Sequence, residues 1–313
     1  MLTKYFDPGA PGLLIRAPHD DAALWRGDRF VVATTDTMAE DVDFRLAWPG
    51  FDYRLLGRRL LSISLSDLAG MGAEPRYALM SLALRPDLSI GDVDSLYAGI
   101  AERAQQFSCA IAGGDLSETR GPLVLTATLI GRLRYSSQVL RRAGARPGWQ
   151  IAVTGTLGGA AAGLRMLEDD RPPRTAHERA WVQAQLDPVP QIKAGRLLVG
   201  LGVRVGGDIS DGLYREVERL VEPSGLGATI DVGSLPLAGG IRADEWALAV
   251  SDSEDFELIC AGPAARIGTA RSALKRQKIS LTIVGEVDRT PGIRFKQNGR
   301  LVELERAGYE HFR

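Results

Sequence analysis

Cysteine and histidine are scarce in this sequence, which argues against disulfide and zinc chemistry. The 313 residues include two cysteines, Cys109 and Cys260, and each lies within an apolar run. A buried free thiol is the usual state of such a residue, so a disulfide framework and a zinc site are both disfavoured. The three histidines, His19, His177 and His311, lie too far apart along the chain to predict a ligand set.

An excess of basic charge is also missing. The formal net charge is -1, whereas binding to nucleic acid or to a membrane surface favours a clear basic excess. No window approaches the length of an apolar membrane span, and residues 1–12 (MLTKYFDPGAPG) lack the apolar centre of a signal peptide. We therefore expect a cytoplasmic protein whose partners include neither nucleic acid nor a membrane.

The familiar nucleotide-binding motifs do not occur. A P-loop needs Gly-Lys followed by Ser or Thr, and the chain has no Gly-Lys pair. The dinucleotide fingerprint fails because Val205 stands where the third glycine after Gly200 and Gly202 belongs. Asp255 and Phe256 are followed by Glu257 rather than by the glycine of a protein kinase. Any phosphate would have to be bound through cations, arginine and backbone N–H groups.

Strand-like and helix-like periods alternate along the chain, which predicts an α/β or α+β fold of two domains with a sheet that need not be all parallel. A strand at 29–35 is expected to end at Asp36. The Gly-, Pro- and Arg-containing segment 141–150 is a plausible boundary, and we place the domains at 1–138 and 139–313. The other expected strands are 76–84, 108–112, 122–134, 150–155, 226–231, 255–260 and 281–287, and the expected helices are 52–69, 92–107, 157–167, 191–200, 211–222, 241–250 and 264–277.

Acidic residues recur in short motifs rich in Gly, Ser and Thr. They are HDDA (19–22), ATTDT (33–37), LSDLAGMG (65–72), AGGDLS (112–117) and GGDISDGL (206–213). We expect their carboxylates to stand at strand ends or helix entrances. Carboxylates without Cys or His neighbours are typical ligands of hard cations such as Mg²⁺, and through them of phosphate. The candidate acids are Asp21, Asp36, Asp67, Asp115, Asp208 and Asp211.

Each motif also has a purely structural interpretation. Asp36 could begin a β-turn, or it could join Thr34 and Thr35 in offering oxygens to one cation. In GGDISDGL, Ser210 or Asp211 could cap the following helix, but a cap does not account for both acids and three glycines. The two glycines before Asp115 would let the backbone approach a phosphate.

Taken in order, the motifs resemble the thiamine-monophosphate kinase family, in the superfamily of aminoimidazole ribonucleotide synthetase and selenophosphate synthetase. The resemblance runs nearly end to end and also covers RRAGARPGWQ (141–150), SEDFELICAG (253–262) and GYEHF (308–312). It implies an N-terminal ATP- and Mg²⁺-binding domain whose sheet pairs with a second subunit to form a barrel, and a C-terminal α/β domain. The partners it implies are ATP as co-substrate, thiamine monophosphate and a second copy of the chain.

The resemblance also implies roles for individual residues. Arg142, Asp208 and Asp211 would be catalytic, and several Mg²⁺ ions would assist direct in-line phosphoryl transfer to thiamine monophosphate, giving thiamine diphosphate without a phospho-enzyme. The expected metal ligands are Asp21, Thr34, Thr35, Asp36, Asp67, Asp115, Asp208 and Asp211. The expected nucleotide contacts are Tyr97, Gly114, Asp115, Arg142 and Ser210. The expected thiamine contacts are Asp43, Glu254 and Tyr309.

Five positions depart from the family pattern, namely His19, Asp43, Trp149, Asp252 and Ser253. Several of them belong to the acceptor side, which leaves open a paralogue that phosphorylates or ATP-activates another small substrate. A non-catalytic nucleotide-binding dimer is the third alternative. The retained acids argue against it, because carboxylates repel one another unless cations lie among them.

Overall fold

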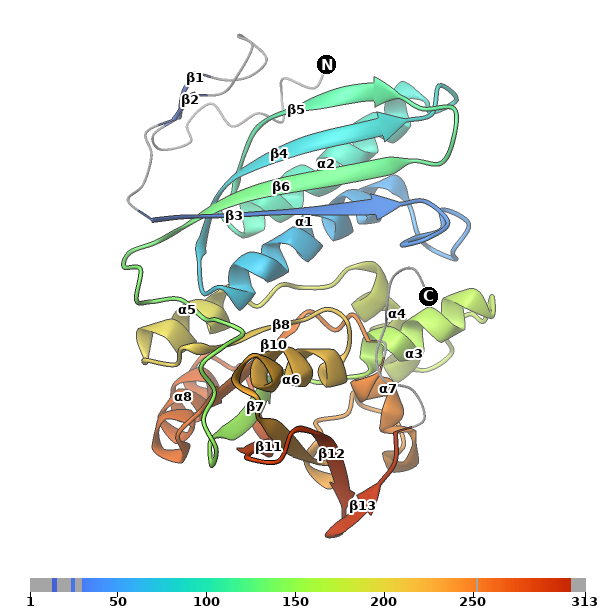
Figure 1. Cartoon of the computed structure of the whole chain (residues 1–313). Helices are drawn as coiled ribbons and strands as arrows, with labels where there is room; N and C mark the ends of the chain where they lie inside the picture. The colour runs from blue at the N-terminus through green and yellow to red at the C-terminus, as the bar shows by residue number, and fades with distance from the viewer. Residues whose placement is uncertain (1–12, 16–23, 26–29, 252, 305–313) are drawn as a thin grey trace. The chain divides into compact units, whose positions relative to one another are not determined.

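The computed structural model describes residues 13–15, 24–25, 30–251 and 253–304 (Figure 1). Contacts divide the chain into two compact units. The first comprises residues 1–68 and 73–136, and the second comprises 69–72 and 137–313. No helix among the described residues is long and apolar enough to cross a membrane.

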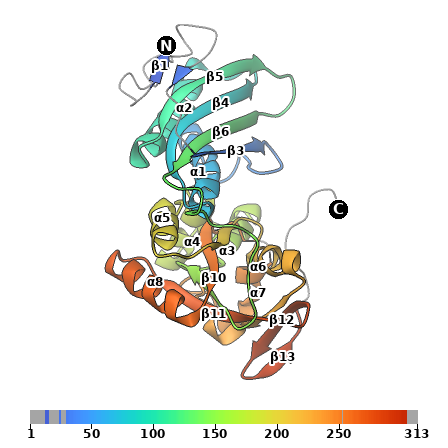
Figure 2. The same cartoon turned by 60° about the vertical axis from the view of Figure 1, so that its left-hand side comes forward.

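The first unit contains a mixed four-stranded sheet in the order β3-β6-β4-β5. β4 and β5 run parallel, and the other neighbouring pairs are antiparallel. Two helices, α1 and α2, cover one face of this sheet (Figures 1 and 2). The bounds are β3 (Phe30–Ala39), α1 (Tyr53–Gly70), β4 (Glu74–Leu84), α2 (Ile90–Gln106), β5 (Ala110–Glu118) and β6 (Val124–Leu133), and a short antiparallel pair, β1 (Leu13–Ile15) and β2 (Leu24–Trp25), precedes them.

The core of this unit forms where α1 meets the sheet. Leu56 and Leu60 lie on the predicted stripe of α1 and are fully buried, as are Leu125 and Leu129 of β6. α2 begins with a capping box in which the Ser89 hydroxyl accepts from the Asp92 backbone N–H.

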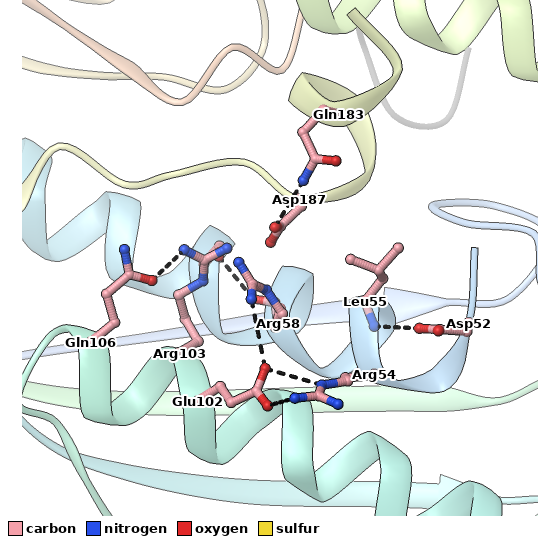
Figure 3. Close-up of polar contacts among 10 residues, drawn as sticks. Asp52, Arg54, Leu55, Arg58, Glu102, Arg103, Gln106, Gln183 and Asp187 are labelled. Carbon is pink, nitrogen blue, oxygen red and sulfur yellow. Dashed lines mark hydrogen bonds and ion pairs between the residues drawn. The ribbon is translucent and has the colours of Figure 1, made fainter. Parts of the chain in front are cut away.

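A charged contact joins the two helices. Glu102 of α2 accepts hydrogen bonds from Arg54 and forms an ion pair with Arg58, both on α1 (Figure 3). The side chains of Glu102 and Arg54 are each a third or more exposed. This ion pair therefore contributes little to stability beyond fixing the register of the helices.

The second unit contains a seven-stranded sheet in the order β13-β12-β9-β11-β7-β10-β8. Only the β12–β9 pairing is parallel, so the sheet is mixed, as the sequence allowed. The strands are β7 (Gln150–Thr154), β8 (Val205–Ile209), β9 (Gly227–Asp231), β10 (Glu257–Gly262), β11 (Leu281–Asp288), β12 (Gly292–Gln297) and β13 (Arg300–Val302).

The helices of the second unit are α3 (Gly159–Glu168), α4 (Ala176–Leu186), α5 (Ile192–Gly200), α6 (Leu213–Val221), α7 (Ala247–Val250) and α8 (Ala264–Arg276), with short 3-10 turns at Glu222–Ser224, Val232–Ser234 and Ala243–Glu245. Apolar side chains of α6 pack on the sheet in the main core. Leu213, Val217 and Leu220 are fully buried against Ile209 and Ile230. This packing fixes the start of α6 beside the end of β8.

Most expected elements are confirmed, but several features differ. The helix expected at 241–250 is reduced to the 3-10 turn Ala243–Glu245 and the four-residue helix α7. β3 continues to Ala39 and β5 continues to Glu118, so Asp36 and Asp115 lie inside strands rather than at their ends. Residues 206–208 of the acidic motif lie within strand β8. This strand was not predicted, because its two glycines leave no apolar alternation in the sequence. The polar segment 168–190 contains α4, and the C-terminal strands β12 and β13 follow β11 without a sequence signal strong enough to predict them.

Candidate active site

In the first unit, Thr34 and Asp67 are brought together from elements far apart in sequence. The Thr34 hydroxyl on β3 donates to the Asp67 carboxylate on α1. Asp36 follows two residues after Thr34 and therefore faces the same, helix-covered side of the sheet. Thr35 faces the opposite side, where its exposed hydroxyl pairs with Thr128 at 2.9 Å. The alternation of side chains along β3 thus places the Thr35 side chain on the opposite face from Thr34 and Asp36.

Tyr97 and Asp115 are coupled electrostatically. Tyr97 of α2 is 3% exposed, and burial, followed by the charge of Asp115, raises the pKa of its phenol to about 12. Asp115 itself is exposed and accepts a hydrogen bond of 3.0 Å from the Ser117 hydroxyl. A Cβ atom on Gly114 would lie 2.1 Å from the carbonyl oxygen of Met80, so this glycine is needed for the approach of β4 to β5. Packing therefore accounts for one of the glycines assigned to phosphate binding.

The second unit contains a chain of alternating charges at the junction of β8 and α6. Asp208, near the end of β8, lies 3.3 Å from Arg142 between carboxylate and guanidinium atoms. The same guanidinium nitrogen lies 3.1 Å from the Glu216 carboxylate. The other oxygen of Glu216 pairs with Arg219, whose second terminal nitrogen lies 2.7 Å from Asp211.

Glu216 is the central member of this charge cluster and was not among the candidates from sequence. It is fully buried, and burial is the largest cause that raises its pKa to about 7. Arg142 and Arg219 act against that shift, whereas Asp208 and Asp211 add to it. The signal in the sequence was its place in the first turn of α6, three residues before Arg219, because residues at that spacing share a helix face.

The start of α6 differs from the prediction. Its N-cap is Gly212, and neither Ser210 nor Asp211 makes a side-chain cap hydrogen bond. Gly212 has φ +86°, and a Cβ there would lie 1.8 Å from the Ser251 carbonyl oxygen. The expected cap was wrong because the tight turn into α6 requires glycine at that position, which leaves Asp211 to pair with Arg219.

The acidic segment before β10 stabilises the start of α3. The buried Asp255 carboxylate accepts from the backbone N–H groups of Gly158 at 2.7 Å and Ala160 at 3.3 Å. The Ser253 hydroxyl accepts from Ala161 at 3.3 Å. Burial raises the pKa of Asp255 to about 6, although these donors favour its ionised form. Asp255 is thus a helix-capping residue.

Two further candidates have local partners. Glu254 accepts a hydrogen bond of 3.2 Å from Gln185. One carboxylate oxygen of Asp43 accepts from the Ala39 N–H at 2.7 Å and closes the loop after β3. Asp21 and Tyr309 lie outside the described residues.

The described part of the chain contains no group of three or more His, Cys, Asp or Glu side chains arranged to bind a metal ion. Mg²⁺ in nucleotide sites is usually bound by one or two carboxylates together with substrate phosphates. In the first unit, the oxygen donors Thr34 and Asp67 suit that mode of binding. The assignment of metal ligands stays a prediction.

Comparisons with known proteins agree with these features. Residues 19–133 match the family model described as AIR synthase related protein, N-terminal domain, and residues 146–297 match the corresponding C-terminal domain. The thiamine-monophosphate kinase of Escherichia coli K12 is 31% identical over 331 residues, covering 100% of this chain and 97% of that protein.

Two solved structures are similar over most of their length. The crystal structure of thiamine-monophosphate kinase from Stenotrophomonas maltophilia K279a has a TM-score of 0.82 and 28% identity, covering 93% of each chain. The structure of AaThiL complexed with AMPPCP and TMP has a TM-score of 0.78 and 27% identity, covering 94% of this chain and 91% of the other. The two-domain mixed α/β fold is therefore shared with both.

Proposed function

The chain belongs to the thiamine-monophosphate kinase family, within the AIR synthase related proteins, and from this premise we propose that it transfers the γ-phosphoryl group of ATP to thiamine monophosphate. The observation that carries the proposal is the likeness over the whole chain to a thiamine-monophosphate kinase. A structural neighbour that contains both AMPPCP and TMP supports the same pair of substrates.

The charge cluster supports the mechanism. Two phosphorylated substrates repel each other, so in-line transfer requires their charge to be neutralised. Arg142 presents a guanidinium group that is 43% exposed at the side chain and can bind phosphate oxygens, while Asp208 and Asp211 would bind Mg²⁺. Mg²⁺ when bound would supply charge neutralisation and orient the phosphates.

No general base is required in this proposal. A phosphate monoester has a second pKa of about 6 and is already an anionic nucleophile near neutral pH. We therefore expect direct transfer with no phospho-enzyme. Within the first unit, Asp36, Asp67 and Asp115 remain proposed Mg²⁺ ligands. Tyr97, Gly114 and Ser210 remain proposed nucleotide contacts.

Three of the five departures from the family pattern have structural explanations that require no other acceptor, whereas His19 and Asp252 lie outside the described residues. Ser253 bonds to the start of α3, and Asp43 closes its own loop. Trp149 packs against the main core of the second unit, and its carbonyl oxygen accepts from Val287 at 2.8 Å. These local roles account for the altered residues without a different substrate, so they give no support to a paralogue with another acceptor.

The uncovered face of the four-stranded sheet supports a homodimer. Val31 is 54% exposed there, and hydroxyl pairs join Thr35 to Thr128 and Thr37 to Thr126. We propose that this face packs on a second copy and completes a barrel across the interface. Light scattering should give twice the chain mass for the wild type, and Thr128→Arg should reduce it; a monomeric wild type would contradict this assignment.

The activity is tested by coupled measurement of ADP release with thiamine monophosphate and Mg²⁺, alongside a panel of other phosphate esters. Thiamine monophosphate should give the fastest turnover and yield thiamine diphosphate by chromatography. Turnover restricted to another ester would refute the proposed acceptor, and binding of ATP without any turnover would indicate a binding protein.

A further inference from the structure

The charge cluster indicates a role for Glu216 that was predicted neither from the GGDISDGL motif nor from the family comparison. Glu216 is fully buried, and each of its two oxygens is paired with a different guanidinium group, those of Arg142 and Arg219. A side chain in that position has no contact with solvent. Any influence it has on the reaction must pass through its two partners.

Arg142 depends on external contacts for its position. It lies in a segment without helix or strand structure, although its neighbour Arg141 forms an isolated bridge with Val205. A long, flexible arginine side chain loses rotamer entropy on being fixed, so its position depends on the groups that hold it. Its guanidinium passes over Gly207, where an added Cβ would lie only 3.1 Å from the Arg142 Nε. Glycine at 207 therefore leaves the space in which Arg142 lies.

Two carboxylates hold the guanidinium, and they are not equivalent. Asp208 is 3.3 Å away and Glu216 is 3.1 Å away. Asp208 is a proposed Mg²⁺ ligand, and a cation bound there would repel Arg142 and compete for the same carboxylate. Glu216 cannot take part in that competition because its second oxygen is occupied by Arg219. It is the carboxyl group that stays available to Arg142 when Asp208 is engaged.

We propose that Glu216 is the positioning residue for Arg142, holding its guanidinium in the geometry that binds the nucleotide phosphates. Arg219 completes the arrangement by binding the other oxygen of Glu216 and, through its second nitrogen, Asp211. The first turn of α6 thus links the two proposed metal-binding acids of the motif to one buried carboxylate. This inference rests on the proposed nucleotide contact of Arg142, and it does not depend on the identity of the acceptor.

The test measures nucleotide affinity in the absence of acceptor, by displacement of a fluorescent ATP analogue from the full chain in Mg²⁺. Glu216→Gln keeps the shape and removes the carboxylate, and it should weaken ATP binding about tenfold or more, because it removes the ion pair between Glu216 and Arg142. Glu218→Gln is the matched control, because Glu218 lies on the same helix and pairs with Arg215 at the same three-residue spacing. Its ATP affinity should equal that of the wild type.

A double-mutant cycle separates positioning from a general structural role. If Glu216 acts through Arg142, Glu216→Gln should change ATP affinity by less than twofold in an Arg142→Ala background. An equal loss in both backgrounds, or unchanged affinity in the single variant, would overturn the proposal. Glu216→Asp keeps the charge but shortens the side chain, so it should also weaken ATP binding, and it replaces Glu216→Gln in the cycle if that variant does not fold.

The proposed function is tested separately from the role of Glu216, by whether the wild-type protein phosphorylates thiamine monophosphate. Wild-type protein that binds ATP but does not phosphorylate thiamine monophosphate would refute the acceptor while the cycle still decides the role of Glu216. Wild-type protein that binds no ATP would overturn both.

Discussion

The surroundings of Glu257 predict how strongly the stability of the protein depends on pH. Its half-buried side chain stands at the start of β10, where the carboxylate accepts hydrogen bonds from the Thr154 hydroxyl at 2.5 Å and from the Gln191 amide at 3.2 Å. Burial, as the largest cause, raises its pKa from 4.5 to about 7, and the charge of Asp255 acts in the same direction. The folded protein therefore holds this proton more tightly than the unfolded chain does.

The direction of the pH effect follows from linkage. Between pH 4.5 and 7 the folded state binds more protons than the unfolded state, so the free energy of unfolding falls as the pH rises through this window. Each pKa unit corresponds to about 1.4 kcal/mol, so the shift amounts to a loss on the order of 3 kcal/mol once Glu257 is ionised. Glutamine at this position is neutral at every pH, so the Glu257→Gln variant does not lose this part of its free energy of unfolding.

Glu257→Gln should therefore be more stable relative to the wild type at pH 8 than at pH 5, by on the order of 3 kcal/mol. For a domain of this size about 1 kcal/mol shifts Tm by about 2–4 °C, so calorimetry at the two pH values should resolve it. Glu286→Gln, an exposed change on strand β11 of the same sheet, is the control and should show no such difference. A Glu257→Gln effect that is the same at both pH values would refute the reasoning.

Three further outcomes are expected. Asp208→Asn should remove ADP release in the coupled assay while leaving Tm unchanged or higher, because a buried charge is lost; retained turnover would exclude this residue from the metal set. Gly114→Ala should lower the free energy of unfolding in urea by about 1–3 kcal/mol, because its Cβ would overlap the Met80 carbonyl oxygen. Gly121→Ala, whose Cβ would meet nothing closer than 3.7 Å, should be neutral, and equal effects would contradict the packing argument. Ser253→Gly should lower Tm modestly without changing the acceptor preference, since it removes a hydrogen bond at the start of α3; a new preferred acceptor would revive the alternative function.

Periodicity and composition were sufficient to predict most helices and most strands, because long elements bury a regular apolar face. The stripe of Leu56 and Leu60 on α1 is an example. The same reasoning failed at the acidic motifs. Glycine and aspartate are poor strand formers, so nothing local indicated that Asp36, Asp115 and Asp208 lie within strands that are held by their neighbours in the sheet.

The sequence by itself determined which acids are present, their order, and the scarcity of cysteine and histidine, because those properties are carried by residue type. Only the tertiary structure decided which groups meet. It turned the Thr35 hydroxyl away from Thr34, since alternate strand residues face opposite sides, and it assigned Asp255 to a helix start. It also placed Glu216 between two arginines that are distant in sequence from each other, a contact that depends on the packing of α6 against the sheet and that no local pattern encodes.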